Sequence, residues 1–403
     1  MILLPWVASA QTLTWQQIRE RFEAGNTALQ GAQLGVDEAR AQEITAFLRP
    51  NPTVTATLDQ FTPFWPNPYR PLGSVLPLVS TNYLHEREGK RELRLESAKK
   101  GTEISASQQA DLERNLVFNL RGAFIQTLQA KAIVEVAREN LAYYDKFLSV
   151  SRDRLSAGDI SQVDLQRLEL QRVQYESDVQ TAEVNTRTAK VQLLQLLNSR
   201  TPADQFDVAG TFDYSETVLD PDELRRIALA SRPDLMLAAH AVDKAQADHR
   251  LAIANGSSDP TFSVDAGRNP PIPVYVGASV SVPLRIFDRN QGEKARTEIE
   301  IQRAQKARET ATGQALADVD SALAALNGSL NLLRPYKSKY LDEAAKVRDT
   351  IAFSYQNGGS SLLEFLAAQN EYRSLRMSYL NLVGSWFTAG NQLNLATGRE
   401  VIP

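Results

Sequence analysis

The chain has 403 residues with 44 Lys+Arg against 48 Asp+Glu, and its net charge of −4 excludes nucleic-acid binding through bulk electrostatics. It contains no cysteine, which excludes disulfides, thiolate metal sites, cysteine nucleophiles and cysteine-linked lipid. The three histidines, His85, His240 and His249, leave little material for a metal or acid–base centre. No run of about 18 apolar residues predicts a transmembrane helix, although the short, half-apolar strands of a β-barrel would escape that test.

The first ten residues have the character of a cleaved leader. Residues 2–10, ILLPWVASA, are apolar and end in Ala8-Ser9-Ala10, a small-x-small pattern of the kind that signal peptidase cuts. The basic region that normally precedes such a stretch is missing. We therefore interpret residues 1–10 as the remnant of a signal peptide and expect export. A disordered or buried tail is the alternative.

Proline placement predicts a very long helix in the first half of the chain. None of the 18 prolines falls between Pro77 and Pro202, and this interval is rich in Ala, Leu, Gln, Glu and Arg. From about residue 86 to residue 157 the helix would be about 110 Å long. Its buried positions are expected at the coiled-coil period of 3.5 residues: Leu116, Leu120, Ala123, Thr127, Ala130, Val134, Ala137, Leu141, Tyr144 and Leu148.

A similar apolar repeat occurs in the second half, between Leu316 and Leu333. Pro335 follows it directly, but the apolar pattern continues, so we expect this proline to kink a continuing helix without ending it. Beyond the proline, the same register predicts that the buried positions are Tyr340, Ala344, Val347 and Ile351.

The chain is an internal duplication. Residues 27–42 align with 233–248, residues 51–56 with 259–264, and residues 154–165 with 354–365. Each half is expected to run helix, strand, Pro-rich loop, strand, long helix, turn and returning helix. The first structural repeat is assigned to 11–201, with strands at about 52–61 and 74–84 and a helical hairpin at about 86–198. A linker at 202–222 leads to the second repeat at 223–398, with strands at about 260–267 and 274–284, a hairpin at about 287–397, and a tail at 399–403.

Three of the four predicted strands alternate between apolar and polar residues, while the one near 74–84 alternates poorly. Strands of about nine or ten residues with one apolar face suit a membrane barrel with a wet lumen, although a soluble sandwich alternates in the same way. Four strands cannot close a barrel alone, so a barrel would need an oligomer. The polar residues expected to face its lumen are Thr53, Thr55, Thr57, Asp59, Ser263, Asp265, Tyr275, Ser279 and Ser281.

Two proline-rich loops connect the strands within each predicted pair. Residues 62–71, TPFWPNPYRP, and 269–273, NPPIP, are expected to form the outer hairpin tips. In the first of them Phe64, Trp65 and Tyr69 are the kind of side chain that gathers at a membrane–water interface.

The turns between the long helices carry duplicated caps. Gly158 is expected to end one helix in the left-handed conformation, and Ser161 with Asp164 three residues later begins the next. Gly358, Ser361 and Glu364 copy this arrangement. The acids have a structural role as caps, worth about 1 kcal/mol each. They could also line a constriction, where a symmetric oligomer would multiply each carboxylate into a ring.

This plan of duplicated strand pairs and helical hairpins resembles the TolC family of outer-membrane efflux ducts, over about residues 12–398. The stretch SRPDL at 231–235 is similar to the R-P-D-L that opens that family's second repeat, and both helix turns look like its periplasmic tips. The stretch EGKRELRLESA at 88–98 is similar to a G-K-R-x-x-R stretch in the heavy-metal efflux branch.

The resemblance implies a homotrimer with a twelve-stranded outer-membrane barrel, four strands from each chain, and a long α-helical periplasmic tunnel. It also implies docking of a periplasmic adaptor protein at the tips and coupling to an inner-membrane pump, of the RND type. Ser360 stands where well-studied members have an arginine, and Ala367 where they have a second acidic ring, so their salt-bridged lock does not carry over directly. The tip, gate and adaptor-contact residues it implies are Gly158, Ser161, Asp164, Tyr355, Gly358, Ser360, Ser361 and Glu364.

We therefore predict a mainly α protein with a β-barrel: a passive outer-membrane duct of a tripartite efflux system in a Gram-negative bacterium, with contact to outer-membrane lipid. The duct is expected to conduct small molecules or metal ions to the exterior. We expect no enzyme activity, no catalytic residue, no cofactor, no metal site and no nucleic-acid partner. His240 and His249 lie nine residues apart on opposite sides of a helix and are interpreted as solvated surface residues. The alternatives are a type I protein-secretion duct and a soluble periplasmic coiled-coil scaffold or adaptor.

Overall fold

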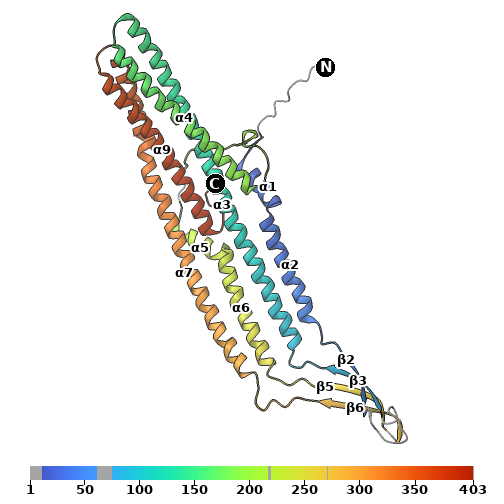
Figure 1. The fold of residues 1–403 in the computed structure, drawn as a ribbon. Coiled ribbons are helices and arrows are strands. Elements are labelled where there is room, and N and C mark those ends of the chain that lie inside the picture. Colours follow the sequence, from blue (N-terminus) through green and yellow to red (C-terminus); the bar gives the residue numbers. More distant parts are fainter. Residues whose placement is uncertain (1–10, 61–74, 217–218, 270, 403) are drawn as a thin grey trace, which may run out of the picture. The chain divides into compact units, whose positions relative to one another are not determined.

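The computed structural model describes residues 11–60, 75–216, 219–269 and 271–402 (Figure 1). The predicted leader at 1–10 and the aromatic loop with Phe64, Trp65 and Tyr69 lie outside these residues. The chain divides into two compact units, and each of them takes segments from both halves of the sequence. Unit 1 comprises Met1–Gly31, Ala110–Pro233 and Thr312–Pro403, and unit 2 comprises Ala32–Gln109 and Asp234–Ala311.

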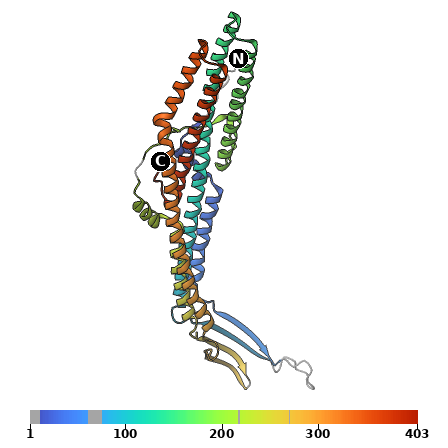
Figure 2. The same cartoon turned by 90° about the vertical axis from the view of Figure 1, so that its left-hand side faces the viewer.

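Unit 2 contains a four-stranded antiparallel sheet in the order β2-β3-β5-β6, whose strands lie side by side in Figures 1 and 2. The strands are β2 (Thr53–Asp59), β3 (Leu76–Leu84), β5 (Thr261–Asn269) and β6 (Ile272–Ser281). The poorly alternating segment near 74–84 is thus an inner strand, and β3 pairs with β5 of the other half of the sequence. Asn269 pairs with Ile272, which confirms the predicted hairpin at 269–273.

The first long helix, α3 (Lys90–Ala157), begins four residues later than the pattern of prolines predicts. Glu88 and Gly89 have positive φ angles of 55° and 63°, which a right-handed helix does not accept, so the helix starts at Lys90. The returning helix is α4 (Gln162–Leu196). The predicted coiled-coil positions of α3 are all buried or half-buried, as the period of 3.5 residues indicates.

The second hairpin confirms that Pro335 kinks a continuing helix. Helix α7 (Gln291–Pro335) passes into a π-helical segment (Tyr336–Tyr340), then α8 (Leu341–Gln356), and α9 (Leu362–Thr397) returns. Of the predicted buried positions beyond the proline, Ala344 and Ile351 are half-buried, but Tyr340 and Val347 were predicted wrongly, because they are 43% and 49% exposed. A π-turn takes one more residue than an α-turn, so it moves the buried stripe forward by one position.

The remaining elements complete the two units. A short parallel pair joins β1 (Gln11–Leu13) to β4 (Phe206–Val208), which follows a 3₁₀ turn at Ala203–Gln205. The helices not yet named are α1 (Trp15–Gly25), α2 (Thr27–Phe47), α5 (Pro221–Ser231) and α6 (Pro233–Ala254). Among the described helices, none is both long and apolar enough to cross a membrane.

Candidate functional site

The two turns between the long helices of unit 1 share one backbone geometry. Gly158 and Gly358 have φ angles of +84° and +78°, as predicted for left-handed helix ends. At the first turn Gly158 N–H donates to the Leu155 carbonyl at 3.0 Å, and the next N–H, of Asp159, to the Arg154 carbonyl at 2.9 Å. The second turn repeats both bonds, and this pair of bonds defines a Schellman motif.

The caps of the returning helices differ in completeness. At α9 the Ser361 hydroxyl accepts from Glu364 N–H at 3.2 Å, while the Glu364 carboxylate accepts from Ser361 N–H at 2.8 Å, a full capping box. At α4, Ser161 accepts from Asp164 N–H at 3.1 Å, but the Asp164 carboxylate accepts from the Ser161 hydroxyl at 2.9 Å instead of the backbone. The aspartate is one methylene shorter, so the predicted capping box is only half formed there.

Hydrogen bonds from Ser361 to the charged form of Glu364, first from its backbone N–H and then from its hydroxyl, hold the pKa of that carboxyl below its usual value of 4.5. A lowered pKa means that the folded state favours the carboxylate, so this cap stabilises α9 at neutral pH. Its contribution is lost as the pH falls below about 4.5 and the carboxyl becomes protonated.

We expect Gly358→Ala to destabilise the second turn by about 1–2 kcal/mol, because a side chain in the left-handed region meets strain. The effect is purely conformational, since a Cβ at Gly358 would meet no atom within 4 Å. Gly328→Ala in α7, where a Cβ also meets nothing within 4 Å, is the control. There alanine should stabilise the helix by about 0.5–1 kcal/mol. Chemical unfolding followed by circular dichroism would measure both, and two changes of the same sign would contradict this account.

Beneath the turns, aromatic side chains from both hairpins form a buried cluster. The Phe147 and Phe365 rings stack with centroids 3.7 Å apart, and Tyr355 lies 5.7 Å and 5.5 Å from them. Tyr355 is only 6% exposed, and its hydroxyl has no hydrogen-bond partner among the described residues. Burial, followed by the nearby Asp164 charge, raises the Tyr355 pKa. The ring of this predicted tip residue therefore packs the two hairpins together.

The residues predicted from the tip motifs did not include Arg154, which lies in the last turn of α3. Its guanidinium donates to the Tyr355 backbone carbonyl at 2.9 Å and lies over the Tyr355 ring at 5.5 Å. An arginine thus does join the two hairpins, although Ser360 occupies the position where one was sought. Ser360 instead donates to the Ser354 hydroxyl at 2.7 Å. Only the folded arrangement could reveal Arg154, because its partner is 201 residues away in the sequence.

The two turns frame a hollow of about 690 Å³ in unit 1. Its charged lining is balanced, with Arg154 and Arg167 against Asp159 and Asp164. Glu364 is the one predicted tip residue that does not line this hollow. The other seven do so, namely Gly158, Ser161, Asp164, Tyr355, Gly358, Ser360 and Ser361.

The register of the sheet in unit 2 separates a polar face from an apolar one. Thr53, Asn82, Ser263 and Ser279 oppose one another in one row across the four strands, and Ser263 donates to the Asn82 side-chain oxygen at 2.7 Å. Because residues two apart on a strand share a face, all nine predicted lumen-facing residues lie on this side of the sheet. The polar face also includes Leu76, Leu78 and Leu84 of β3, which explains its poor alternation.

The opposite face of the sheet is apolar and open. Its rows include Val54, Thr81, Val264 and Ala278, and Ala56, Val79, Ala266 and Val276. The valines of these rows are 47% to 74% exposed. An exposed apolar sheet face of this kind marks an interaction surface for protein or membrane.

The stretch Gly89-Lys90-Arg91, with Arg94, holds the junction between sheet and helices in unit 2. Lys90 is 4% exposed and its ammonium group donates to the Asp259 carboxylate at 2.6 Å. Arg94 pairs with Glu86 and donates to the carbonyls of residues 46 and 48 at the end of α2, both at 3.3 Å. The Arg91 guanidinium lies 4.3 Å from the centre of the Phe47 ring. Each basic residue of this stretch therefore has a structural partner.

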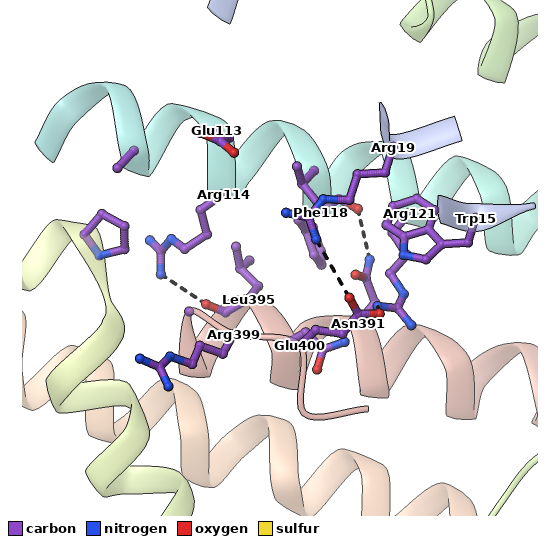
Figure 3. A pocket seen from close by; sticks show the side chains of 15 residues that line it. Trp15, Arg19, Glu113, Arg114, Phe118, Arg121, Asn391, Leu395, Arg399 and Glu400 are labelled. Carbon is purple, nitrogen blue, oxygen red and sulfur yellow. Dashed lines mark hydrogen bonds and ion pairs between the residues drawn. The ribbon is translucent and has the colours of Figure 1, made fainter. Parts of the chain in front are cut away.

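A pocket of about 290 Å³ in unit 1 gathers several arginines (Figure 3). Arg121 pairs with Glu400 at 2.6 Å and donates to the Ile402 carbonyl, while Arg114 donates to the Leu395 carbonyl at 3.1 Å. These bonds fasten the C-terminal segment to α3. The pocket therefore has the chemistry of a structural clamp, and no nucleophile is paired with a base among its lining residues.

The expectation that His240 and His249 are solvated was wrong. The His240 ring contacts the Ser107 hydroxyl of α3 at 3.1 Å, and the His249 ring contacts the Thr297 hydroxyl of α7 at 2.8 Å. Both rings are half-buried, because opposite sides of α6 pack against two different helices. The nine-residue spacing does place the two rings on opposite sides of the helix, as predicted. Among the described residues, no group of three or more His, Asp or Glu side chains could hold a metal ion.

Residues 224–399 match the family model described as outer membrane efflux protein. The chain is 24% identical over 320 residues to the cobalt-zinc-cadmium resistance protein CzcC of Cupriavidus metallidurans, an alignment that covers 78% of this chain and 75% of CzcC. It is also 24% identical to the pyoverdine export outer membrane protein OpmQ of Pseudomonas aeruginosa and to the cation efflux system protein CusC of Escherichia coli K12. These alignments cover 72% and 70% of this chain and 63% of either relative.

Solved structures with the same fold cover nearly the whole chain. The structure of CusC matches with a TM-score of 0.79 and 19% identity over 99% of this chain and 95% of CusC. The open-state outer membrane channel MtrE of Neisseria gonorrhoeae matches with a TM-score of 0.76 and 18% identity over 100% of this chain and 94% of MtrE.

Proposed function

We propose, from the premise that this chain is an outer membrane efflux protein of a Gram-negative bacterium, that three copies form the passive exit duct of a tripartite efflux system. A periplasmic adaptor protein and an inner-membrane pump of the RND type would complete the system. The duct itself does no chemistry in this proposal, because energy for transport comes from the pump. The observation that carries the proposal is the sheet of unit 2, whose register separates a polar face from an open apolar one.

The two faces of this sheet support its place in a membrane barrel. The apolar face would contact outer-membrane lipid, and the polar face would line the lumen. Four strands are too few to close a barrel, but three copies supply twelve, with β2 of one copy beside β6 of the next. The repeats at 11–201 and 223–398 would each contribute two strands and one helical hairpin. The lumen-facing set is the nine-residue polar set named above, from Thr53 to Ser281.

Metal cations are the cargo that the polar face fits best. Within the described strands this face carries Asp59 and Asp265 and no basic side chain, so three copies would place six carboxylates in the lumen. A lumen with one sign of charge favours counter-ions of the other sign. The relatives CzcC and CusC are named for metal or cation efflux, whereas OpmQ is named for pyoverdine export. No observation in unit 1 or unit 2 favours protein secretion.

The two helix turns would form the periplasmic tip, where the adaptor docks and the passage narrows. The supporting feature is the common hollow at these turns, with Asp164 and Tyr355 in its lining. Glu364 lies one residue beyond the hollow's lining at the start of α9, and threefold symmetry would repeat its carboxylate around the passage. The proposed tip residues are the eight given above, from Gly158 to Glu364.

The double variant Asp164→Ala with Glu364→Ala is expected to raise single-channel conductance about twofold or more and to weaken cation preference. Both carboxylates are removed from the constriction, and with them go the hydrogen bonds that they accept from Ser161 and Ser361 and that restrict the motion of the turns. Conductance and reversal potential in planar bilayers measure the two effects. Asp342→Ala with Glu343→Ala, exposed acids of α8 away from the turn, is the control. If conductance and reversal potential are unchanged in the double variant, these acids cap helices and do not act in gating or selectivity.

The duct itself is tested with purified wild-type protein in the same bilayers. We expect discrete conductance steps and a reversal potential that reports preference for cations, and we expect loss of metal resistance in cells that lack the gene. Conductance that favours anions would contradict the proposed cargo. Absence of conductance with protein correctly inserted in the bilayer would contradict the duct.

A further inference from the structure

The segment between β6 and α7 in unit 2 exposes three large apolar side chains in succession. Leu284 is 80% exposed, Ile286 is 61% exposed and Phe287 is 91% exposed. Single exposed apolar residues are common on protein surfaces, but a contiguous group that includes an open aromatic ring marks an interaction surface. These three residues belong neither to the proposed tip and adaptor contact nor to the proposed lumen. We call Leu284, Ile286 and Phe287 the apolar loop.

The apolar loop follows directly on a strand of the sheet. Val274, Val276 and Val280 lie on the apolar face of β6, and the last ladder pair of the strand is Thr261 with Ser281. Beyond Ser281 the chain is no longer a strand, but Val282, Leu284 and Ile286 are all exposed. Phe262, also exposed, opposes Tyr83 on the apolar face near this end of the sheet. Exposed apolar side chains therefore continue along the chain from β6 to the segment before α7.

Hydrogen bonds hold the backbone of this segment in place, so the exposure of Phe287 is built into the fold. The Ser258 hydroxyl donates to the Pro283 carbonyl at 2.5 Å, and Ile286 N–H donates to the Leu284 carbonyl at 2.9 Å. The Gln291 side-chain amide donates to the Phe287 carbonyl at 3.2 Å. The ring is thus presented outward from an ordered turn.

Cationic groups accompany the apolar loop. Arg289 is exposed two residues after Phe287, and half-buried Arg285 lies close enough to Asp259 to lower that carboxyl's pKa. Apolar side chains beside exposed arginine are the composition that binds the boundary between acyl chains and phosphate headgroups. The corresponding segment of the first half, residues 85–89, contains His, Glu, Arg, Glu and Gly and no large apolar side chain. The apolar loop therefore occurs once in each chain.

We propose that the apolar loop inserts into the phospholipid leaflet beside the helical end of the sheet, with Phe287 at the acyl–headgroup boundary and Arg289 at the phosphates. This inference rests on the proposed function, because the sheet must itself be in a bilayer. Its position directly after β6, whose valines would contact lipid, favours lipid over a second copy of the chain as the occupant. Three such loops would hold the sheet at a fixed depth in the membrane.

The absence of cysteine permits a direct test with single nitroxide labels. Phe287→Cys, Val274→Cys and Arg87→Cys would each be labelled, reconstituted in phospholipid vesicles and measured by electron paramagnetic resonance with oxygen and a water-soluble nickel chelate as relaxing agents. Phe287 is 91% exposed, so its replacement leaves folding intact. We expect labels at 274 and 287 to contact oxygen several-fold more than nickel, with a smaller ratio at 287. The label at 87, in the polar counterpart segment, should contact nickel more.

Each other outcome is decisive. If the label at 287 contacts nickel while that at 274 contacts oxygen, the apolar loop lies in water; this proposal is then overturned and the duct stands. If the label at 287 is shielded from both agents and its spectrum is broadened by the labels of the other copies, the loop packs against a second chain. That result also overturns this proposal. If the label at 274 contacts nickel, the sheet is not in lipid and the proposed function itself fails.

Discussion

Lys90→Met is expected to lower the free energy of unfolding of unit 2 by about 3–5 kcal/mol, because it leaves a partly buried carboxylate without its cation. The Lys90 ammonium group donates to Asp259 at 2.6 Å and to the Ser257 carbonyl at 2.9 Å. Burial acts to raise the pKa of Asp259, but hydrogen bonds from Lys90 and from Arg87 N–H outweigh it and hold this pKa below 3.8. The ion pair therefore stabilises the fold above that pH and is lost as the pH falls through the lowered pKa.

Hydrogen exchange of residues 85–95 and 256–262, together with chemical unfolding in detergent, would measure this loss. Lys99→Met is the matched control, since Lys99 is exposed on the same helix, and we expect a change of at most about 0.5 kcal/mol there. Adding Asp259→Leu to Lys90→Met should recover part of the stability by removing the unpaired charge. A change at Lys90 no larger than that at Lys99 would contradict the role of the ion pair.

Phe365→Ala is expected to destabilise the tip of unit 1 by about 3–5 kcal/mol. Phe365 is fully buried, its ring stacks 3.7 Å from Phe147, and it lies 5.5 Å from Tyr355. Removing it opens a cavity where side chains of α3, α8 and α9 meet. Because this cluster lies next to the turns at the ends of the hairpins, we expect local opening of the turns before global unfolding.

Hydrogen exchange resolved by peptide should show faster exchange over residues 350–368 in Phe365→Ala. Leu363→Ala is the matched control on the same helix, because Leu363 is 77% exposed and should change exchange little. Arg154→Ala provides a second comparison, since it removes the bond to the Tyr355 carbonyl and the guanidinium over the Tyr355 ring but leaves the buried aromatic rings in place. Equal exchange in Phe365→Ala and Leu363→Ala would show that the aromatic cluster does not hold the tip together.

Local rules were strong enough to predict the long helices and the turns between them. The 3.5-residue period of α3, the positive φ of Gly158 and Gly358, and the caps at Ser161 and Ser361 all depend on residues a few positions apart. The continuing helix at Pro335 was predictable for the same reason. The π-turn was not, because the sequence does not show which turn absorbs the kink, and beyond it Tyr340 and Val347 of the predicted buried positions are exposed.

The polar face of the sheet was also predictable, since alternation within β2, β5 and β6 is a local property. The contribution of β3 to this face was not predictable from the sequence. The strand alternates poorly, and only its pairing with β5, from the other half of the chain, assigns each of its residues to a face. The strand predicted at about 274–284 ends at Ser281 in the structure, and exposed apolar side chains continue beyond it at Leu284 and Ile286.

The sequence by itself determined most elements of this protein, its duplicated plan, the polar residues of its strands and its resemblance to outer-membrane efflux ducts. Tertiary structure decided which distant residues meet: Lys90 with Asp259, Arg154 with the Tyr355 carbonyl, and Phe147 with Phe365. The physical reason is separation along the chain. Periods, caps and turns act over a few residues, whereas these partners lie 169, 201 and 218 positions apart and are brought together only when the two halves of the chain pack.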